Sequence, residues 1–497
     1  MSKSCIVLQS GGPTSVINAS LYGVIKEAKK HVEIKKLYGA LNGIDGLLNN
    51  RIIDLYKQDD KEITRLLYTP SAILGTVRHF LPDDFNNKTY ELIYNQLIKY
   101  DIGYFILIGG NDSMDTINKL SAYLKLKEYD CKFIGVCKTI DNDLVLTDHT
   151  PGYGSAIKYI ATTIAEIKED TACYENGRVT IVELMGRDAG WLTAGSKLAS
   201  VNGNGPDLIY LPEVPFNVDA FLNDVKKIYD KNKKVLVAIS EGIKDENNEY
   251  ILKKYKYLSD NDVFGHMQLG GASSVLASIV HEKLNLPVRN VELNLPQRCA
   301  SHIGSLTDIN EAKNCGIQAI RLLIKNESGK MVAIKRVNDN PYKVKYVGVN
   351  LNDVANKVKE FPIDWIINGN DISNEYIKYA MPLIKGAIKL EEENGIVRYA
   401  KLNKTIIKEQ KWFKNHLMGW KSHFLMMYSY SYYLFKVNNY NLTCTRYGIV
   451  RPLSLKFDII SSLGLLFLSM LHAAFKSAFI TFPLLAWYKP LYILFPK

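Results

Sequence analysis

The stretch KTIDNDL at residues 138–144 places one cation and two carboxylates within six residues. It follows the apolar run KFIGVC, which predicts a loop at the end of a buried strand. A hydroxyl that attacks a phosphoryl group needs a base near its proton, and the developing negative charge needs a cation. Asp141 and Lys138 are the candidates for these roles, with Asp143 near a metal or supporting the base. A solvated turn is the alternative explanation for this stretch.

Two other strand ends carry glycines that suit a bound phosphate. QSGGPTSVIN (9–18) predicts a strand, a glycine pair and a helix that begins near Thr14. GGNDS (109–113) has the same design, and Asn111 and Asp112 add oxygen ligands for Mg²⁺ or phosphate. Glycines let the backbone approach an anion, and a helix start offers unpaired N–H groups. Ser113 is expected to cap the second helix, and a simple tight turn is the alternative for the first loop.

Two further loops predict contacts to a phosphorylated sugar. ELMGRDAGW (183–191) is a strand followed by a glycine turn and Arg187, and Arg178 begins the same strand. Guanidinium groups suit phosphate oxygens because their donors form a fixed fork, although a single arginine is usually a surface charge. SEG (240–242) places Glu241 after the run KVLVAIS, where its carboxylate can accept hydrogen bonds from sugar hydroxyls.

The elements that must position these loops follow an α/β alternation over residues 4–400. Short runs rich in Val, Ile and Tyr recur, with amphipathic segments of helical length between most of them. Runs that are apolar on both faces indicate buried parallel strands. We therefore expect two doubly wound, Rossmann-like lobes with mainly parallel sheets. The active site is expected in the cleft between them, at the carboxyl ends of the strands.

The ordered loops together resemble the phosphofructokinase family. The resemblance covers about residues 4–400 and rests on QSGGPTSVIN, LGTVR (74–78), GGNDS, KTIDNDL, TPGYGSA (150–156), MGR (185–187), SEG and PQR (296–298). It implies transfer of a phosphoryl group from a donor to the 1-hydroxyl of fructose 6-phosphate. It also implies a donor-phosphate lobe from residues 1–138 with about 285–310, and a fructose 6-phosphate lobe from residues 139–284 with about 311–400.

The resemblance assigns roles to individual residues. Asp141 would be the base on the 1-hydroxyl, with Lys138 as its cation and Asn111 as the Mg²⁺ ligand. The sugar would be held by Thr139, Asp143, Met185, Gly186, Arg187 and Glu241, and the donor phosphates by Gly11, Arg78, Asp112 and Ser113.

Two stretches compete for the sugar phosphate. GHMQLGG (265–271) has leucine where the family has arginine, whereas VRNVELNLPQR (288–298) has Arg289 and Arg298 nine residues apart, just before a helical segment. We choose the second stretch, although Leu295 stands where the family has histidine. In the family, the equivalents of Arg178 and Arg289 reach the site from a neighbouring subunit. A homodimer or homotetramer with shared active sites is therefore implied.

Asp112 and Lys138 indicate the donor. Members that use ATP generally have glycine at both positions, and Asp112 would put negative charge where the α-phosphate must lie. This favours the pyrophosphate-dependent branch. One alternative is an ATP-dependent enzyme. The other is a non-catalytic regulatory subunit, which Asn111 and Leu295 favour. A nicotinamide-dependent oxidoreductase is set aside because SGGPTSV is not the glycine fingerprint of that class.

The charge of the chain is concentrated at its end. The net charge is +11, but residues 401–497 hold 13 of the 62 basic and 2 of the 51 acidic residues, which leaves 49 of each for residues 1–400. A nucleic-acid partner is therefore not expected. Seven scattered cysteines indicate a reducing, cytoplasmic location, and we expect no leader because Met1 runs directly into a strand.

The aromatic, basic tail at residues 409–497 lies outside the resemblance. Its apolar run 459–475 is near the length of a membrane span, but His472 and Lys476 weaken that interpretation. An interaction segment and an extension without selected function are the other two interpretations. We favour the extension.

Overall fold

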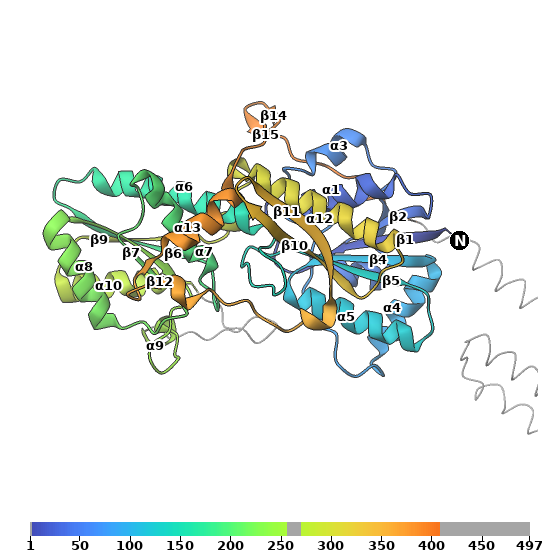
Figure 1. Ribbon diagram of the computed structural model, residues 1–497, viewed down its shortest axis with the longest axis horizontal. Coiled ribbons are helices and arrows are strands. Elements are labelled where there is room, and N and C mark those ends of the chain that lie inside the picture. The colour runs from blue at the N-terminus through green and yellow to red at the C-terminus, as the bar shows by residue number, and fades with distance from the viewer. Residues whose placement is uncertain (1, 256–269, 408–497) are drawn as a thin grey trace, which may run out of the picture. The chain divides into compact units, whose positions relative to one another are not determined.

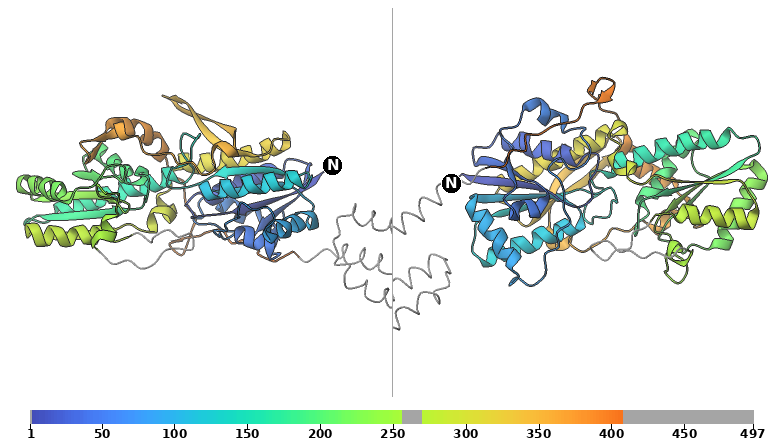
Figure 2. Two further views of the ribbon diagram at one scale, coloured as in Figure 1. Left: turned by 90° about the horizontal axis from the view of Figure 1, so that it is seen from below. Right: turned by 180° about the vertical axis from the view of Figure 1, so that it is seen from behind.

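The computed structural model describes residues 2–255 and 270–407, all within the compact unit Met1–Lys408. This unit contains two lobes, each built on a mainly parallel β-sheet with helices on both faces (Figures 1 and 2). The fold class expected from the sequence is confirmed. The tail 409–497 and most of the stretch 265–271 lie outside the described residues. Within the described part of the chain, no helix is long and apolar enough to cross a membrane.

The first lobe is formed around a seven-stranded sheet of order β11-β10-β5-β4-β1-β2-β3. Its five inner strands are parallel, and β3 and β11 pair antiparallel at the two edges. The strands are β1 (Lys3–Gln9), β2 (Ile34–Ala40), β3 (Ile52–Asp54), β4 (Ile102–Gly109), β5 (Lys132–Cys137), β10 (Lys330–Asp339) and β11 (Tyr342–Asn350). The helices are α1 (Ile17–Ala28), α2 (Gly43–Leu48), α3 (Asp60–Arg65), α4 (Lys88–Lys99), α5 (Asn111–Leu126) and α12 (Leu306–Ile324).

The second lobe is formed around a four-stranded parallel sheet of order β7-β8-β6-β9. Its strands are β6 (Arg178–Leu184), β7 (Leu208–Tyr210), β8 (Lys234–Ser240) and β9 (Val288–Glu292). Its helices are α6 (Tyr153–Ala172), α7 (Trp191–Ala194), α8 (Val218–Asn232), α9 (Ile251–Tyr255), α10 (Ala272–Leu284) and α13 (Asn374–Ala380), while α11 (Pro296–Cys299) lies between β9 and α12. Short pairs β12–β13 (Ile366–Ile367, Asp371–Ile372) and β14–β15 (Glu392–Glu393, Ile396–Val397) complete the described chain.

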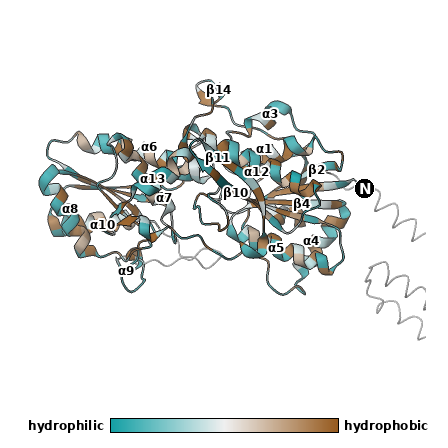
Figure 3. Cartoon of the chain, viewed as in Figure 1, coloured by the Kyte–Doolittle hydropathy of each residue, from teal (hydrophilic) through white to brown (hydrophobic). Residues whose placement is uncertain are grey.

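The inner strands are apolar throughout because both faces of each sheet are covered. In β6, Val179 and Ile181 face the cluster formed with α8 and α10, whereas Val182 and Leu184 face the cluster formed with α6. All four side chains are buried. Figure 3 shows the same arrangement, with hydrophobic strands inside and mixed helices outside. This is the continuous apolar pattern that buried parallel strands require.

Helices α1 and α12 pack so closely that their backbones are in contact. A Cβ atom on Gly23 would lie 2.0 Å from the carbonyl oxygen of Lys313. A Cβ atom on Gly316 would lie 2.0 Å from the carbonyl oxygen of Ser20. Only glycine fits at these two positions. Helix α1, which follows the predicted donor loop, is thus fixed against a helix nearly 300 residues later.

The predicted division of the C-terminal half between the lobes is wrong at two places. Strand β9, which we expected in the donor-phosphate lobe, pairs with β6 in the second sheet. Helix α12 and strands β10 and β11, which we expected in the other lobe, belong to the first lobe, where β10 pairs with β5. Alternating apolar runs predict strands but do not say which sheet each strand joins. Residues 361–383 do pack into the second lobe, through Phe361 and Tyr376.

Candidate active site

The three phosphate-type loops predicted in the first lobe meet at one edge of its sheet. Strands β1, β4 and β5 are neighbours and parallel, so their carboxyl ends lie together. The Lys138 amide donates to Gly109 O at 3.0 Å, which joins the loop after β5 to the loop after β4. Lys138 Nζ donates to Gly12 O at 2.7 Å, which joins it to the loop after β1. Helix α1 begins at Ile17, three residues later than the expected start near Thr14.

Lys138 is buried, with 2 % of its surface exposed, and fills the space beside the double glycine. A Cβ atom on Gly11 would lie 3.3 Å from Lys138 Nζ, so the ammonium and the glycine backbone are adjacent. Burial lowers the pKa of Lys138 to about 8, and the charges of Asp141 and Asp143 oppose this shift. An anion bound at the glycines would therefore meet a positive charge that water solvates poorly.

Asp141 is held in a fixed orientation by Thr139. The Thr139 hydroxyl donates to Asp141 Oδ2 at 3.1 Å and accepts from the Asp141 amide at 3.1 Å. Burial raises the pKa of Asp141, while the Thr139 hydroxyl, Lys138, Arg78 and Arg298 act to lower it. A carboxylate whose pKa is raised toward neutrality is a better base than one in water. The arrangement suits proton abstraction from a hydroxyl.

Asp143 shares this environment. Burial, and then the charge of Asp141, raise the pKa of Asp143 to about 7, against the opposing effect of Lys359 and Lys138. Its Oδ1 atom is buried and accepts no hydrogen bond from the described residues. A buried carboxylate oxygen of this kind suits a ligand or a cation that is bound during the reaction.

Arg78 and Arg298 approach the same centre from two other parts of the chain. The Thr76 hydroxyl donates to Gly11 O at 2.7 Å and so holds the loop that carries Arg78 against the double glycine. A Cβ atom on Gly12 would lie 3.8 Å from Arg298 Nη1. Both guanidinium groups act to lower the pKa of Asp141. Together with Lys138, they place three cationic side chains around Asp141.

The second lobe contributes the loops after β6 and β8. The Gly186 amide donates to Glu241 Oε1 at 3.2 Å. Burial raises the pKa of Glu241 to about 7, and the charge of Asp141 adds to the rise, whereas Arg187 opposes it. The Met185 amide donates to Gln297 Oε1 at 3.2 Å, which ties the same loop to α11.

At the start of α5 the structure differs from two expectations. Ser113 makes no capping bond, because the helix already begins at Asn111 and Gly110 is the residue before it. The Ser113 hydroxyl instead packs against Gly109, since a Cβ atom on Gly109 would lie 2.1 Å from Ser113 Oγ. Asn111 donates from Nδ2 to Lys357 O at 2.8 Å, and its Oδ1 accepts from the Asn356 amide at 2.8 Å. Its neighbour Asp112 is exposed.

Arg178 and Arg289 lie at the other end of the second sheet. Arg178 begins β6, and Arg289 on β9 stands beside Thr180 of β6. The loop with Met185 follows the opposite end of β6, about 20 Å along the strand from Arg178 and about 13 Å from the level of Arg289. Arg178 Nη1 lies 3.9 Å from Asp170 Oδ2, and its guanidinium stacks on Tyr174. These arginines therefore do not join the site of their own chain.

Three neighbours of the site were not predicted from the sequence. Gln297 is buried and supports the loop at Met185, although it lies inside the motif PQR. Gly12 accepts the hydrogen bond from Lys138. Lys359 Nζ donates to Asp148 O at 2.9 Å and to Asn142 Oδ1 at 3.2 Å. The double glycine was a signal for Gly12, whereas nothing near Lys359 in the sequence pointed to the loop.

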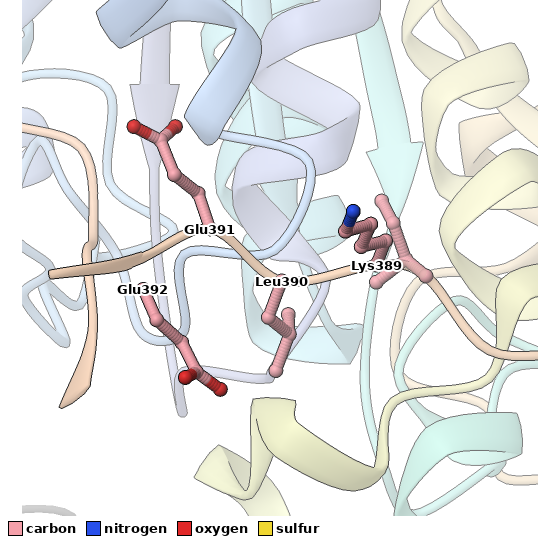
Figure 4. Close-up of a pocket in the computed structure, with 5 residues that line it drawn as sticks. Lys389, Leu390, Glu391 and Glu392 are labelled. Carbon is pink, nitrogen blue, oxygen red and sulfur yellow. The ribbon is translucent and has the colours of Figure 1, made fainter. Parts of the chain in front are cut away.

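A surface hollow elsewhere in the structure carries none of the predicted residues. Figure 4 shows it beside residues 388–392, with Lys389 and two glutamates among its lining. One of these carboxylates, Glu391, accepts from Arg65 Nε at 2.9 Å. Glu391 thereby anchors this part of the chain to α3, so the hollow is a packing feature of the surface.

Comparison with known proteins identifies the family. The model of the family described as Phosphofructokinase matches residues 4–291. The chain belongs to the phosphofructokinase family. A pyrophosphate–fructose 6-phosphate 1-phosphotransferase of Halomonas elongata is 37 % identical over 402 residues, which cover 80 % of this chain and 95 % of that protein. The corresponding protein of Xanthomonas campestris is 38 % identical over 408 residues, with 80 % and 96 % covered.

A solved structure agrees with these relatives. The pyrophosphate-dependent phosphofructokinase of Nitrosospira multiformis superposes with a TM-score of 0.75 at 34 % identity. The superposition covers 82 % of this chain and 99 % of that one.

Proposed function

We propose that this phosphofructokinase transfers a phosphoryl group from pyrophosphate to the 1-hydroxyl of fructose 6-phosphate. The products are fructose 1,6-bisphosphate and phosphate. One observation carries the proposal: the buried ammonium of Lys138 lies against Gly11 and Gly12 and beside Asp141. The chain thus joins a phosphate-binding loop, a cation and a base in one place. These are the groups that phosphoryl transfer to a hydroxyl requires.

Some residues of the site remove the proton from the attacking hydroxyl, and others stabilise the charge on the phosphate groups or hold the sugar. Asp141, oriented by Thr139, takes the proton from the attacking hydroxyl. Arg298, which the sequence assigned to the sugar phosphate, lies beside Gly12, and in this proposal it acts with Lys138 and Arg78 to offset the charge that develops on the transferred group and on the departing phosphate. The sugar is held from the second lobe by Met185, Gly186, Arg187 and Glu241, and Asp143 flanks the base.

The choice of donor depends on the positions and charges of Lys138 and Asp112. Lys138 occupies the position beside the double glycine, where it pairs with the phosphates of a short donor. Asp112, at the start of α5, adds negative charge that disfavours a longer polyphosphate. Both features support pyrophosphate over ATP. The relatives named above carry pyrophosphate in their names.

Mg²⁺ fits the site through carboxylates and not through Asn111. Both polar atoms of Asn111 already bond the backbone at residues 356 and 357. Asp112 and Asp143 lie in the loops after the adjacent strands β4 and β5, and Asp143 Oδ1 accepts no hydrogen bond from the described residues, so these two carboxylates would hold the ion together with phosphate oxygens. When bound, the ion would neutralise phosphate charge.

The position of Arg178 and Arg289 supports a shared active site. They lie at the far end of their own second sheet, so in this proposal they contact the sugar phosphate bound by a neighbouring subunit. A homodimer or homotetramer satisfies this requirement. A cytoplasmic location is part of this proposal, and the scattered cysteines of the sequence support it.

The test is turnover by the full chain with fructose 6-phosphate and Mg²⁺, offering pyrophosphate or ATP in separate reactions. Fructose 1,6-bisphosphate is measured through coupled aldolase and dehydrogenase reactions. We expect turnover with pyrophosphate and at most about 1 % of that rate with ATP. Turnover with ATP alone would overturn the donor assignment. A folded protein that binds fructose 6-phosphate without turnover would favour a regulatory subunit.

A further inference from the structure

Residues 355–360 cross from the first lobe to the second beside the catalytic loop. Leu351 and Val354 are buried in the core of the first lobe, and Phe361 is buried in the core of the second. In Figure 1 this part of the chain runs from beside α5 toward the second lobe. We call residues 355–360 the strap. The mechanism proposed above does not use it.

Asn111 fastens one end of the strap. Its amide nitrogen donates to Lys357 O and its amide oxygen accepts from the Asn356 amide, both at 2.8 Å. Asn356 Nδ2 adds a bond to Asp115 Oδ1 at 3.0 Å on the next turn of α5. A side-chain amide has both an N–H donor and a carbonyl acceptor, and the backbone at residues 356 and 357 needs one of each. A carboxylate would accept from Asn356 but would face Lys357 O without a proton to donate.

The strap in turn holds the catalytic loop. Val358 pairs with Leu144 as an antiparallel bridge, and the Lys359 amide donates to Asp143 O at 2.7 Å. The Lys359 ammonium donates to Asp148 O, at 2.9 Å, and to Asn142 Oδ1. Asp143 lies two residues from the proposed base.

Lys359 also connects the loop to the second lobe. Trp191 Nε1 donates to Lys359 O at 3.0 Å, and the Lys359 ammonium lies 5.0 Å from the Trp191 ring centroid. Within a few residues, the strap therefore contacts α5, the catalytic loop and the second lobe.

We propose that the strap positions the catalytic loop and that Asn111 is its fastening residue, not a metal ligand. This inference rests on the proposed function, because it assigns a role within the same site. Loss of the fastening lets the loop that carries Asp141 move relative to the donor phosphates. A displacement of about 1 Å in such a site costs about 100-fold in rate.

The first experiment compares Asn111→Asp and Asn111→Ala with the wild-type chain. Asn118→Asp is the matched control, because it makes the same charge change further along α5. We expect kcat with pyrophosphate to fall about 10- to 100-fold in both Asn111 variants. The Mg²⁺ concentration for half-maximal rate should stay within about threefold of wild type. If Asn111→Asp keeps the wild-type kcat and needs less Mg²⁺, Asn111 is a metal ligand and the inference is overturned.

A second readout does not depend on turnover. Amide hydrogen exchange over residues 139–150 should be at least about tenfold faster in Asn111→Ala than in wild type and Asn118→Asp. Exchange at the wild-type rate would overturn the positioning role, even if kcat fell. A wild-type chain without turnover would contradict the proposed function, while the exchange comparison would still test the strap.

Lys359→Met removes the ammonium at the other end of the strap and keeps the length of the side chain. Lys345→Met, at an exposed position on β11, is the control. We expect Lys359→Met to lower kcat about tenfold or more, to leave the KM for fructose 6-phosphate within about threefold, and to speed exchange over 139–150. A kcat within twofold of wild type, or a rise in that KM alone, would contradict the inference.

Discussion

Replacement of Lys138 by methionine isolates the contribution of the buried cation. Methionine has a similar length and no charge, so Lys138→Met removes the hydrogen bond to Gly12 O and the positive charge beside Gly11. A unit charge about 4 Å from a phosphate charge contributes about 4 kcal/mol at the effective dielectric constant of such sites. That energy corresponds to about a 10³-fold change in rate.

We therefore expect kcat/KM for pyrophosphate to fall about 10³-fold in Lys138→Met, while the melting temperature stays close to that of wild type. Stability should be kept because burial already disfavours the charged form and lowers the pKa of Lys138 to about 8. Lys125→Met, at an exposed position on α5, is the control. Initial rates with limiting pyrophosphate give the comparison. A loss below about tenfold in a folded variant would refute the reasoning that Lys138 faces the donor.

Three further predictions follow from the same geometry. Asp112→Gly should raise the ratio of kcat/KM for ATP to kcat/KM for pyrophosphate about 5- to 10-fold, because an exposed like-charge contact contributes about 1 kcal/mol; an unchanged ratio in steady-state assays would contradict the role of Asp112 in donor choice. A plot of kcat/KM against pH should rise through about pH 7, because Asp143 and Glu241 lose protons there. It should fall above about pH 8, because Lys138 and Lys359 lose theirs. A flat profile from pH 6 to 9 would contradict the assignment of these four groups to the site. Burial alone would lower the pKa of His149, but Glu311 and Asp148 raise it from 6.5 to about 9, so its contribution is fully present below pH 6.5 and is lost as pH rises through 9. In urea titrations, the difference in unfolding free energy between wild type and His149→Gln should therefore shrink by about 3 kcal/mol between pH 6.5 and 9. An equal difference at both pH values would contradict a stabilising charge on His149.

The sequence predicted the reactive loops well because each lies directly after an apolar run. KFIGVC and the run before GGNDS form the neighbouring parallel strands β5 and β4, which bring their loops to one edge of the first sheet, and KVLVAIS forms β8 in the second sheet. The lobe assignment of β9 and of α12 with β10 was wrong, since strand pairing depends on the whole sheet and not on the local pattern.

Side-chain roles were harder to predict where the partner is backbone from a distant segment. Asn111 was assigned to the metal from its place in GGNDS, but its partners are peptide groups about 245 residues later. No motif in the sequence distinguishes Lys359 from the other lysines, because only the fold brings its ammonium to Asp148 O.

The most direct test of the account is the turnover number of Asp141→Asn with pyrophosphate, fructose 6-phosphate and Mg²⁺. Asparagine keeps the shape of the side chain and its bonds to Thr139 but cannot take a proton at neutral pH. The account predicts a fall in kcat of about 10³-fold, with the KM for fructose 6-phosphate within about threefold of wild type. A kcat within about tenfold of wild type would mean that Asp141 is not the base, and would contradict the central claim.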